Sequence, residues 1–478
     1  MQSKVSDLAL ALAFAISLAL LLSVTKPTTG LVVAVGALVL LVAFLSTTAS
    51  LYLLIVSMLL GPEFLVGGLG GATTAAGRGI TLRFDDFLIV VIGLGWFAKV
   101  SVHRAGAGIT ANPLNRWIAL YILASVLATL FGVMQGRVSS KTAFFFLLKY
   151  YEYVFIYFMV LNAVTTLKQM KNLVAASLVT CFLVSLFAIS QIPSGERASA
   201  PFEGEMGEPN TLGGYLVFML AVVTGFLFTP GAVPRRMPLV ILFGAGFVGL
   251  LATLSRTSFL AAGVVGLAAI GLLAARRSLW LPVALAVCVG GVVAMPAPVK
   301  ERVLYTFTQA REEGQIQVGR LRVDTSTSER LRSWQQSWTM FVQHPLLGAG
   351  VTGGPFMDAM YPRVLSETGL IGMAAFLAML WGAAKIGMRS YRSAVDPFQK
   401  ALALGFLLGF LGLLVHAVGA NTFLIVRIME PFWLYLALVM RGYLLEQHQR
   451  DEQAAVLSVP AMPPGRTAVP LFNKSSLS

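Results

Sequence analysis

The sequence predicts an all-α polytopic membrane protein with about 12–14 transmembrane helices and one long extracytoplasmic loop that contains amphipathic helices. Of the 478 residues, 57% are hydrophobic and only 12% are charged, whereas soluble domains carry roughly 25% charged residues. The charges are unbalanced, with 35 Lys and Arg against 21 Asp and Glu and a net charge of +14. These proportions exclude a soluble globular enzyme, a disordered chain and a nucleic-acid binder with its basic face in water.

Long apolar runs mark the membrane spans, because a helix needs about 20 mainly apolar residues to cross a bilayer. The first run is expected to be an uncleaved helix, since no small-residue cleavage site follows it. The spans are expected at Leu8–Val24, Gly30–Phe44, Leu51–Val66, Phe87–Val102, Trp117–Met134, Ala143–Val164, Leu173–Ile192, Leu212–Phe228, Leu239–Leu254, Phe259–Ala274, Leu279–Met295, Val364–Met388, Ala401–Ala420 and Ile428–Leu444.

Lys and Arg in the short loops predict the orientation, because cytoplasmic loops carry the excess of basic residues. With both termini in the cytoplasm, the basic pairs Arg235–Arg236 and Arg276–Arg277 fall inside. Five regions follow. They are N-terminal transmembrane helices (1–192), transmembrane helices with two Arg-containing outer loops (193–296), an extracytoplasmic loop (297–363), C-terminal transmembrane helices (364–445) and a cytoplasmic, disordered tail (446–478).

The long outer loop contains one segment with helical periodicity, Ser328–Gln343. Its apolar residues fall on one stripe, formed by Leu331, Trp334, Trp338 and Phe341. We expect an amphipathic helix that begins at the serine and lies on the membrane face or caps a cavity.

Arg256 occupies the tight turn between two apolar runs. Its planar guanidinium suits a phosphate or diphosphate, and the hydroxyls of Thr257 and Ser258 at the next helix N-terminus add donors for the same anion. An arginine that snorkels to the membrane interface explains the position equally well.

The loop before the eighth span, Pro193–Asn210, combines Arg197 with several glutamates. Such a cluster can bind a polar ligand or a cation, and the alternative is a solvated loop. Asn210 is predicted to be the N-cap of the next helix.

Ionisable groups also lie within the predicted spans. Lys149 and Glu152 can neutralise each other at i,i+3 on one helix face. This pair, together with His416 and Glu430, is either functional or a structural feature of the bundle. Cys181 and Cys288 each lie in a long apolar run and are predicted to be packing residues.

The long loop supplies the remaining candidates. The outer-face residues are Arg330, Arg332, His344 and Arg363, with Glu367 at the start of the next helix. Several arginines on one membrane face would gather an anionic, lipid-linked donor. No metal-binding, nucleotide-binding or nucleophile motif occurs in the sequence, so an enzyme here is expected to work without a metal or cofactor.

Three stretches of the sequence resemble the O-antigen ligase/polymerase superfamily of membrane glycosyltransferases. They are the loop of Arg197–Leu216, the turn of Ser255 and Arg256, and the long stretch Glu329–Phe376. The last contains the family's succession of Arg, Trp, His-Pro-Leu, Gly-x-Gly and Glu-x-Gly-Leu-Ile-Gly. The resemblance covers roughly residues 190 to 440.

This resemblance implies glycan transfer from a polyprenyl-diphosphate-linked donor on the extracytoplasmic face of a bacterial inner membrane. Family arginines bind the donor diphosphate, which implies Arg197, Arg256, Arg330, Arg332 and Arg363, together with His344, as candidate substrate-binding residues. Arg256 would also stabilise the charge that develops on the leaving diphosphate. The acceptor is a glycan or a lipid, and a flippase and a chain-length regulator are implied partners in the bilayer.

One departure from the family pattern distinguishes a polymerase from a ligase. Family ligases carry a histidine base shortly before the Glu-x-Gly stretch, where this sequence has Asp358-Ala359-Met360-Tyr361-Pro362-Arg363. A polymerase of O-antigen or exopolysaccharide repeats, with Glu367 or Asp358 as the base, is therefore favoured over a ligase. A flippase or other transporter of lipid-linked oligosaccharide is the more distant alternative.

Overall fold

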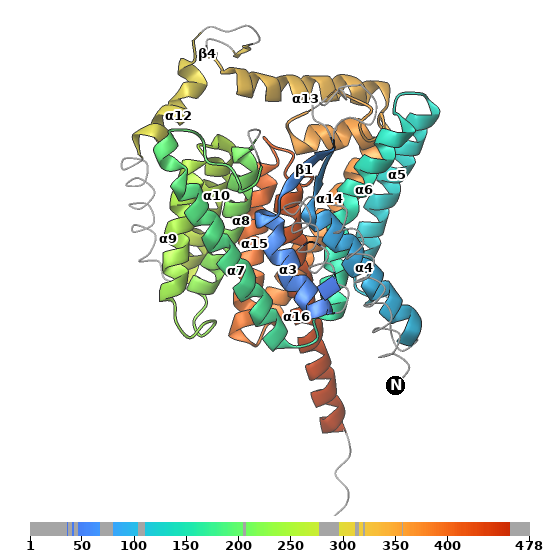
Figure 1. Ribbon diagram of the computed structural model, residues 1–478, viewed down its shortest axis with the longest axis vertical. Coiled ribbons are helices and arrows are strands. Elements are labelled where there is room, and N and C mark those ends of the chain that lie inside the picture. The colour runs from blue at the N-terminus through green and yellow to red at the C-terminus, as the bar shows by residue number, and fades with distance from the viewer. Residues whose placement is uncertain are drawn as a thin grey trace, which may run out of the picture.

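The computed structural model describes residues 46–66, 80–103, 110–203, 207–276, 296–310, 315–318, 321–355 and 357–458, together with positions 36, 41 and 42. These residues form a bundle of long helices, with one further helix lying across the end of the bundle (Figure 1). The predicted all-α polytopic membrane fold is confirmed.

Within this described part, seven helices are long and apolar enough to cross a membrane. They are α5 (Asn115–Met134), α6 (Ser140–Ala163), α7 (Leu167–Ser190), α8 (Pro209–Phe228), α14 (Met360–Ser393), α15 (Pro397–His416) and α16 (Val426–Ser458). The other helices are α3 (Thr47–Leu60), α4 (Phe84–His103), α9 (Met237–Ala252), α10 (Arg256–Arg276), α12 (Ala297–Thr308) and α13 (Thr325–Gln343). The expected spans Leu8–Val24 and Leu279–Met295, with Cys288, lie outside the described residues, so the count of 12–14 stays a prediction.

Two short antiparallel hairpins interrupt the helical pattern. β1 (Glu63–Val66) pairs with β2 (Ile80–Arg83), and β3 (Gln317–Val318) pairs with β4 (Leu321–Arg322). The first hairpin joins α3 to α4, and the second lies between α12 and α13.

Helices α8 and α15 form the centre of the bundle and pack closely along their length. A Cβ added to Gly225 would lie only 2.4 Å from the backbone nitrogen of Gly405, and a Cβ on Gly405 would lie 2.7 Å from the Cα of Val222. Small residues allow two helix backbones to approach in this way in membranes, where close packing replaces the hydrophobic driving force. The tightest packing of the two helices therefore depends on glycine.

Several helix starts follow local sequence signals. Thr166 and Gln169 form a complete capping box at α7, and Asp396 caps α15 through the amides of Phe398 and Gln399. The prediction that Asn210 is an N-cap is wrong. α8 begins at Pro209, whose missing N–H costs nothing at the first helical position, and the Asn210 carboxamide oxygen instead accepts a hydrogen bond from another helix end.

The last helix is longer than expected. α16 continues to Ser458, so the predicted disordered tail (446–478) is helical over its first part, and Figure 1 shows it projecting from the end of the bundle opposite α13. Positions 459–478 lie outside the described residues.

The amphipathic helix predicted in the long loop is present as α13, and its apolar stripe faces away from the bundle. α13 begins at Thr325, earlier than predicted, because Asp324 caps it by accepting a hydrogen bond from the Thr327 amide. The serines at 328, 333 and 337 are buried, whereas Trp338 is 62% exposed. Thus α13 packs its small polar face on α14, and its apolar stripe is free of the bundle.

Candidate active site

The turn between α9 and α10 carries Arg256 and has a strained backbone. Leu254 adopts φ +46°, a left-handed conformation that is unfavourable for a residue with a branched side chain. Such strain costs of the order of 1–3 kcal/mol and persists only where the surroundings fix it. The Thr253 hydroxyl accepts from the Ser255 amide and helps to close the turn.

Arg256 joins this turn to the segment that crosses the end of the bundle. Its guanidinium donates to Thr306 Oγ1 on α12 and to Asp324 Oδ2 at the start of α13, each at 2.5 Å. Asp324 is buried, and burial alone would raise its pKa. The hydrogen bonds from Arg256 and Thr327 outweigh burial and hold the pKa below its usual value. Both helices are thereby attached to the turn.

Arg197 is held against the same turn. The amide of Ala198 donates to Ala252 O at 3.0 Å, and Arg197 Nε donates to Thr253 O at 3.2 Å. Burial, followed by the nearby Arg302, Arg256 and Arg330, lowers the pKa of Arg197 to about 10. A guanidinium stays protonated at neutral pH even so, so Arg197 adds a positive charge beside Arg256, Arg302 and Arg330.

Arg330 reaches the site from the second turn of α13. Its Nε donates to Gly419 O at 2.8 Å, in the loop after α15, and its Nη2 lies 3.9 Å from Asp358 Oδ2. Burial lowers the pKa of Arg330, and Arg256 lowers it further. The side chain of Asp358 is 43% exposed, which makes it the accessible carboxylate at this site.

Arg302 is a fourth guanidinium that sequence reasoning missed. It lies on α12, stacks near the Tyr305 ring at 5.5 Å, and its pKa is lowered by burial and by Arg256. Its Nε is buried with no hydrogen-bond partner among the described residues. The available signal was a helical period in 297–308, a stretch that we treated only as loop.

The other predicted binding residues lie elsewhere. Arg332 is exposed, on a different face of α13 from Arg330. His344 ends α13, where slight burial and Arg137 lower its pKa. At a rise of 1.5 Å per residue it lies roughly 20 Å along the helix from Arg330. The arginine cluster, as we use the term, therefore comprises Arg197, Arg256, Arg302 and Arg330.

Arg363 and Glu367 form a separate group with Tyr150. Arg363 Nε lies 3.1 Å from Glu367 Oε1, and Arg363 Nη2 donates to the Tyr150 hydroxyl at 2.7 Å. Glu367 Oε1 also accepts from the Thr352 amide at 3.3 Å. Glu367 Oε2 accepts from the Tyr150 hydroxyl at 3.4 Å, so this carboxylate is engaged by an arginine, a tyrosine and a backbone amide.

Glu367 sits beside a break in α14. Gly369 has φ +63° and ψ −162°, and the amides that follow it leave the helix pattern. The Leu370 amide donates to Pro345 O at 2.8 Å and the Ile371 amide to Leu346 O at 3.2 Å. The His-Pro-Leu and Glu-x-Gly-Leu-Ile-Gly motifs thus pair with each other through the backbone.

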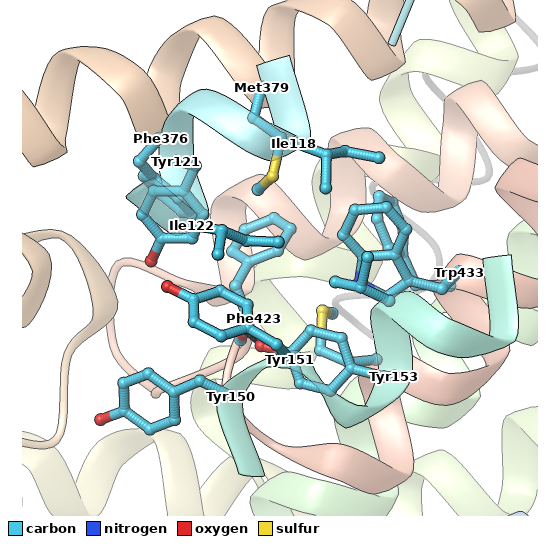
Figure 2. A pocket seen from close by; sticks show the side chains of 13 residues that line it. Ile118, Tyr121, Ile122, Tyr150, Tyr151, Tyr153, Phe376, Met379, Phe423 and Trp433 are labelled. Carbon is cyan, nitrogen blue, oxygen red and sulfur yellow. Dashed lines mark hydrogen bonds between the residues drawn. The ribbon is translucent and has the colours of Figure 1, made fainter. Parts of the chain in front are cut away.

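A cavity lined by aromatic residues lies beside this group, between α5, α6, α14 and α16. Figure 2 shows Tyr121, Tyr151, Tyr153 and Trp433 around it, with Tyr150 at one edge. Tyr150, Tyr151 and Tyr153 lie next to Lys149 and Glu152 on α6.

The ionisable residues inside the bundle are paired. The predicted Lys149–Glu152 pair is confirmed at 3.1 Å, and Lys149 Nζ also lies 2.6 Å from Asp86. Glu430 lies 3.5 Å from Arg83, which also contacts Asp85 at 2.9 Å. Arg83 and Asp85 were not anticipated: Arg83 ends the short hairpin between α3 and α4, and Asp85 lies in the first turn of α4.

The chemistry available at the α13 end is therefore anion binding beside a carboxylate. Asp324 and Asp358 pair with two of the four guanidiniums, and Glu329 also acts on Arg330, so among these described residues positive charge is in excess. The described residues contain no group of three or more His, Cys, Asp or Glu side chains placed to hold a metal ion.

Fold and site together define a multi-pass helical membrane protein with an anion site at one end of its bundle. A family model described as O-Antigen ligase matches residues 239–368. That segment runs from α9 to the break in α14 and includes Arg256, Asp324, Arg330 and Asp358. The match confirms the resemblance to the O-antigen ligase/polymerase superfamily. A comparison with curated proteins gives no match.

Proposed function

We propose that the protein is a membrane glycosyltransferase that transfers glycan from a polyprenyl-diphosphate-linked donor to an acceptor hydroxyl on the extracytoplasmic face of a bacterial inner membrane. The observation that carries the proposal is the convergence of the arginine cluster beside Asp358. In this proposal the α13 end of the bundle faces outward, and both termini are cytoplasmic. The basic pairs of the short loops support that orientation.

The reaction needs stabilisation of a leaving diphosphate. The acceptor oxygen attacks the anomeric carbon of the donor, the bond from that carbon to the phosphate oxygen breaks, and the polyprenyl diphosphate leaves with the bonding electrons. Preorganised guanidiniums stabilise the charge that develops on the leaving group. Arginine suits this task because its planar fork binds phosphate oxygens in pairs.

Asp358 is the proposed general base that takes the proton of the acceptor hydroxyl. Its side chain is 43% exposed and lies 3.9 Å from Arg330, whereas the side chain of Glu367 is only 10% exposed and contacts Arg363, Tyr150 and a backbone amide. A base must reach its substrate before its pKa matters, which favours Asp358 over Glu367.

Polymerisation of lipid-linked repeats is the favoured reaction, because residues 358–363 contain no histidine. Ligation to a lipid A core or a protein is the second candidate, and the description of the matching family model favours it. A transporter of lipid-linked oligosaccharide is the third, but it would place its key charges along a central route. The four guanidiniums gather instead at one end of the bundle.

The test uses purified protein in lipid nanodiscs with one defined lipid-linked repeat as the only donor and acceptor. Arg330→Ala should lower turnover by about 100-fold or more, the usual effect of removing one charge-stabilising donor. Arg332→Ala, on the same helix but outside the cluster, is the matched control and should stay within about threefold of wild type. Equal activities of the two variants would refute the proposal. A ladder of longer lipid-linked products indicates a polymerase, and product only with added lipid A core or protein indicates a ligase.

The orientation is tested with a cysteine at the exposed Gln336 of α13 in a cysteine-free background. An impermeant thiol reagent added to intact spheroplasts should label it. Labelling only after the membrane is opened would place the arginine cluster in the cytoplasm and contradict the proposed location.

A further inference from the structure

A chain of hydrogen-bonded polar side chains runs from the Arg256 turn into the interior of the bundle. Ser255 Oγ donates to Asn210 Oδ1 at 2.7 Å, and the hydroxyls of Ser255 and Ser258 lie 2.8 Å apart. Ser258 Oγ lies 3.1 Å from His416 Nε2, and His416 Nδ1 lies 2.8 Å from Thr422 Oγ1. The chain connects the ends of α8, α10 and α15.

The surrounding helices are shaped to admit this chain. A Cβ added to Gly213 of α8 would lie 2.2 Å from Ser258 Oγ, and one added to Gly214 would lie 3.0 Å from a carbon of the His416 ring. Two successive glycines thus make the space that the serine and the imidazole occupy. Ser255, Ser258 and His416 have no exposed surface.

The turn that this chain contacts requires external support. Leu254 is held at φ +46°, and the same turn carries Arg256 and supplies the Thr253 carbonyl that accepts from Arg197. A strained backbone stays in place only when neighbouring contacts determine it. Ser255 and Ser258, on the two sides of Arg256, are the residues through which the chain reaches the turn.

We propose that His416 is a positioning residue for the arginine cluster. Through Ser258 it fixes the turn that aims Arg256 and anchors Arg197, and through Thr422 it ties that turn to the loop after α15. This inference rests on the proposed function, in which these two arginines bind the donor diphosphate. His416 is fully buried, so it does not contact substrate and is not the missing base.

In this proposal the contact of His416 Nε2 with Ser258 holds the turn. Two substitutions distinguish the contribution of Nε2 from that of Nδ1. The amide of Gln at position 416 can reach the place of Nε2 and bond Ser258, whereas the shorter Asn reaches only the place of Nδ1 and bonds Thr422. His416→Gln should therefore keep the turn in place, and His416→Asn should release it. Both variants remain polar, and both remove the imidazole ring.

The experiment measures inorganic pyrophosphate binding by isothermal titration in nanodiscs, which needs no glycan substrate. We expect the dissociation constant to rise about tenfold or more in His416→Asn and to change less than threefold in His416→Gln. Ser258→Ala should match His416→Asn, and the double variant should be no worse than either. Ser177→Ala removes another buried serine hydroxyl that contacts Tyr435 at 2.6 Å, and it should bind as wild type does.

The outcomes separate the two proposals. If wild type does not bind pyrophosphate, the proposed function fails and the positioning role fails with it. If wild type binds and Arg256→Lys weakens binding, the diphosphate site stands. Equal behaviour of His416→Gln and His416→Asn, or additive effects of His416→Asn and Ser258→Ala, would then overturn the positioning role alone. Ser258→Ala serves as the second variant where a change at His416 lowers the yield of folded protein.

Discussion

The break in α14 offers the sharpest test of how this fold is built. Gly369 has φ +63° and ψ −162°, a region that is essentially restricted to glycine. A Cβ added there would lie 2.4 Å from the carbonyl oxygen of Leu346 and 2.6 Å from the amide nitrogen of Gly348. Neither atom belongs to a flexible side chain, so the Pro345–Gly350 segment itself must move.

The cost of Gly369→Ala can be worked from these contacts. An alanine in this conformation costs about 1–3 kcal/mol. Moving the backbone also disturbs two hydrogen bonds, from the amides of Leu370 and Ile371, each worth about 0.5–1.5 kcal/mol net. Together they give a loss of about 2–6 kcal/mol. Even the lower bound should reduce the melting temperature by about 2 °C, because the entropy of unfolding is about 2.1 cal/mol/K per residue and the chain has 478 residues.

The assay is fluorescence-detected size exclusion after heating the purified protein in detergent. Gly266→Ala is the matched control, because no heavy atom lies within 4 Å of its added Cβ in α10. Replacing an unconstrained helical glycine is expected to be neutral or stabilising by about 0.5–1 kcal/mol. If Gly369→Ala melts at the temperature of Gly266→Ala, the break is not held as the structure describes and the reasoning is wrong.

Three further predictions concern the α13 end and the bundle centre. Asp324→Asn should keep the cap of α13 but weaken the attachment of the helix to Arg256. Asp324→Ala should lose a further ~1 kcal/mol of capping. Proteolysis of 297–343 should therefore be slowest in wild type, faster in Asp324→Asn and fastest in Asp324→Ala. Because the pKa of Asp324 is held below its usual value, its stabilising contribution is present above about pH 4 and lost as pH falls below that. Acid should thus speed this cleavage in wild type but much less in Asp324→Asn, and equal acceleration would contradict the ion pair. Gly405→Leu should abolish the folded monomer peak, since even a Cβ would meet Val222 at 2.7 Å, whereas Gly244→Leu, with nothing within 4 Å of its Cβ, should retain it.

The membrane fold was predictable because apolar length and charge bias act locally along the chain. The orientation predicted from the basic short loops also assigned Arg197, Arg256 and Arg330 to the same side of the membrane. Contacts among their segments, such as Ala198 to Ala252 and Arg330 to Gly419, bring these residues to one end of the bundle. Hydropathy could not show which arginines converge, because that depends on the order in which the helices pack.

Two residues show that the order of motifs along the sequence is insufficient to identify the members of the site. Glu367 belongs to a distinctive motif, yet its carboxylate is occupied by Arg363 and Tyr150 beside the Gly369 break. Arg302 belongs to no motif that we identified, yet its guanidinium lies beside Arg256. The different surroundings of Glu367 and Arg302 arise from tertiary packing, because α12 and α13 cross the end of the bundle whereas Glu367 lies at the break within α14.

The orientation of α13, with its polar face on the bundle, has a physical reason that applies to any helix lying across the end of a transmembrane bundle. In a soluble domain, an apolar stripe faces an apolar core. The end of a bundle instead presents helix termini and loops, whose backbone carbonyls need donors. Arg330 supplies one to Gly419 O at 2.8 Å in the loop after α15, and Ser337 donates to Pro362 O at 2.6 Å in the first turn of α14. The polar face of α13 is therefore complementary to the end of the bundle. This orientation places Arg330 in the arginine cluster and Arg332 outside it.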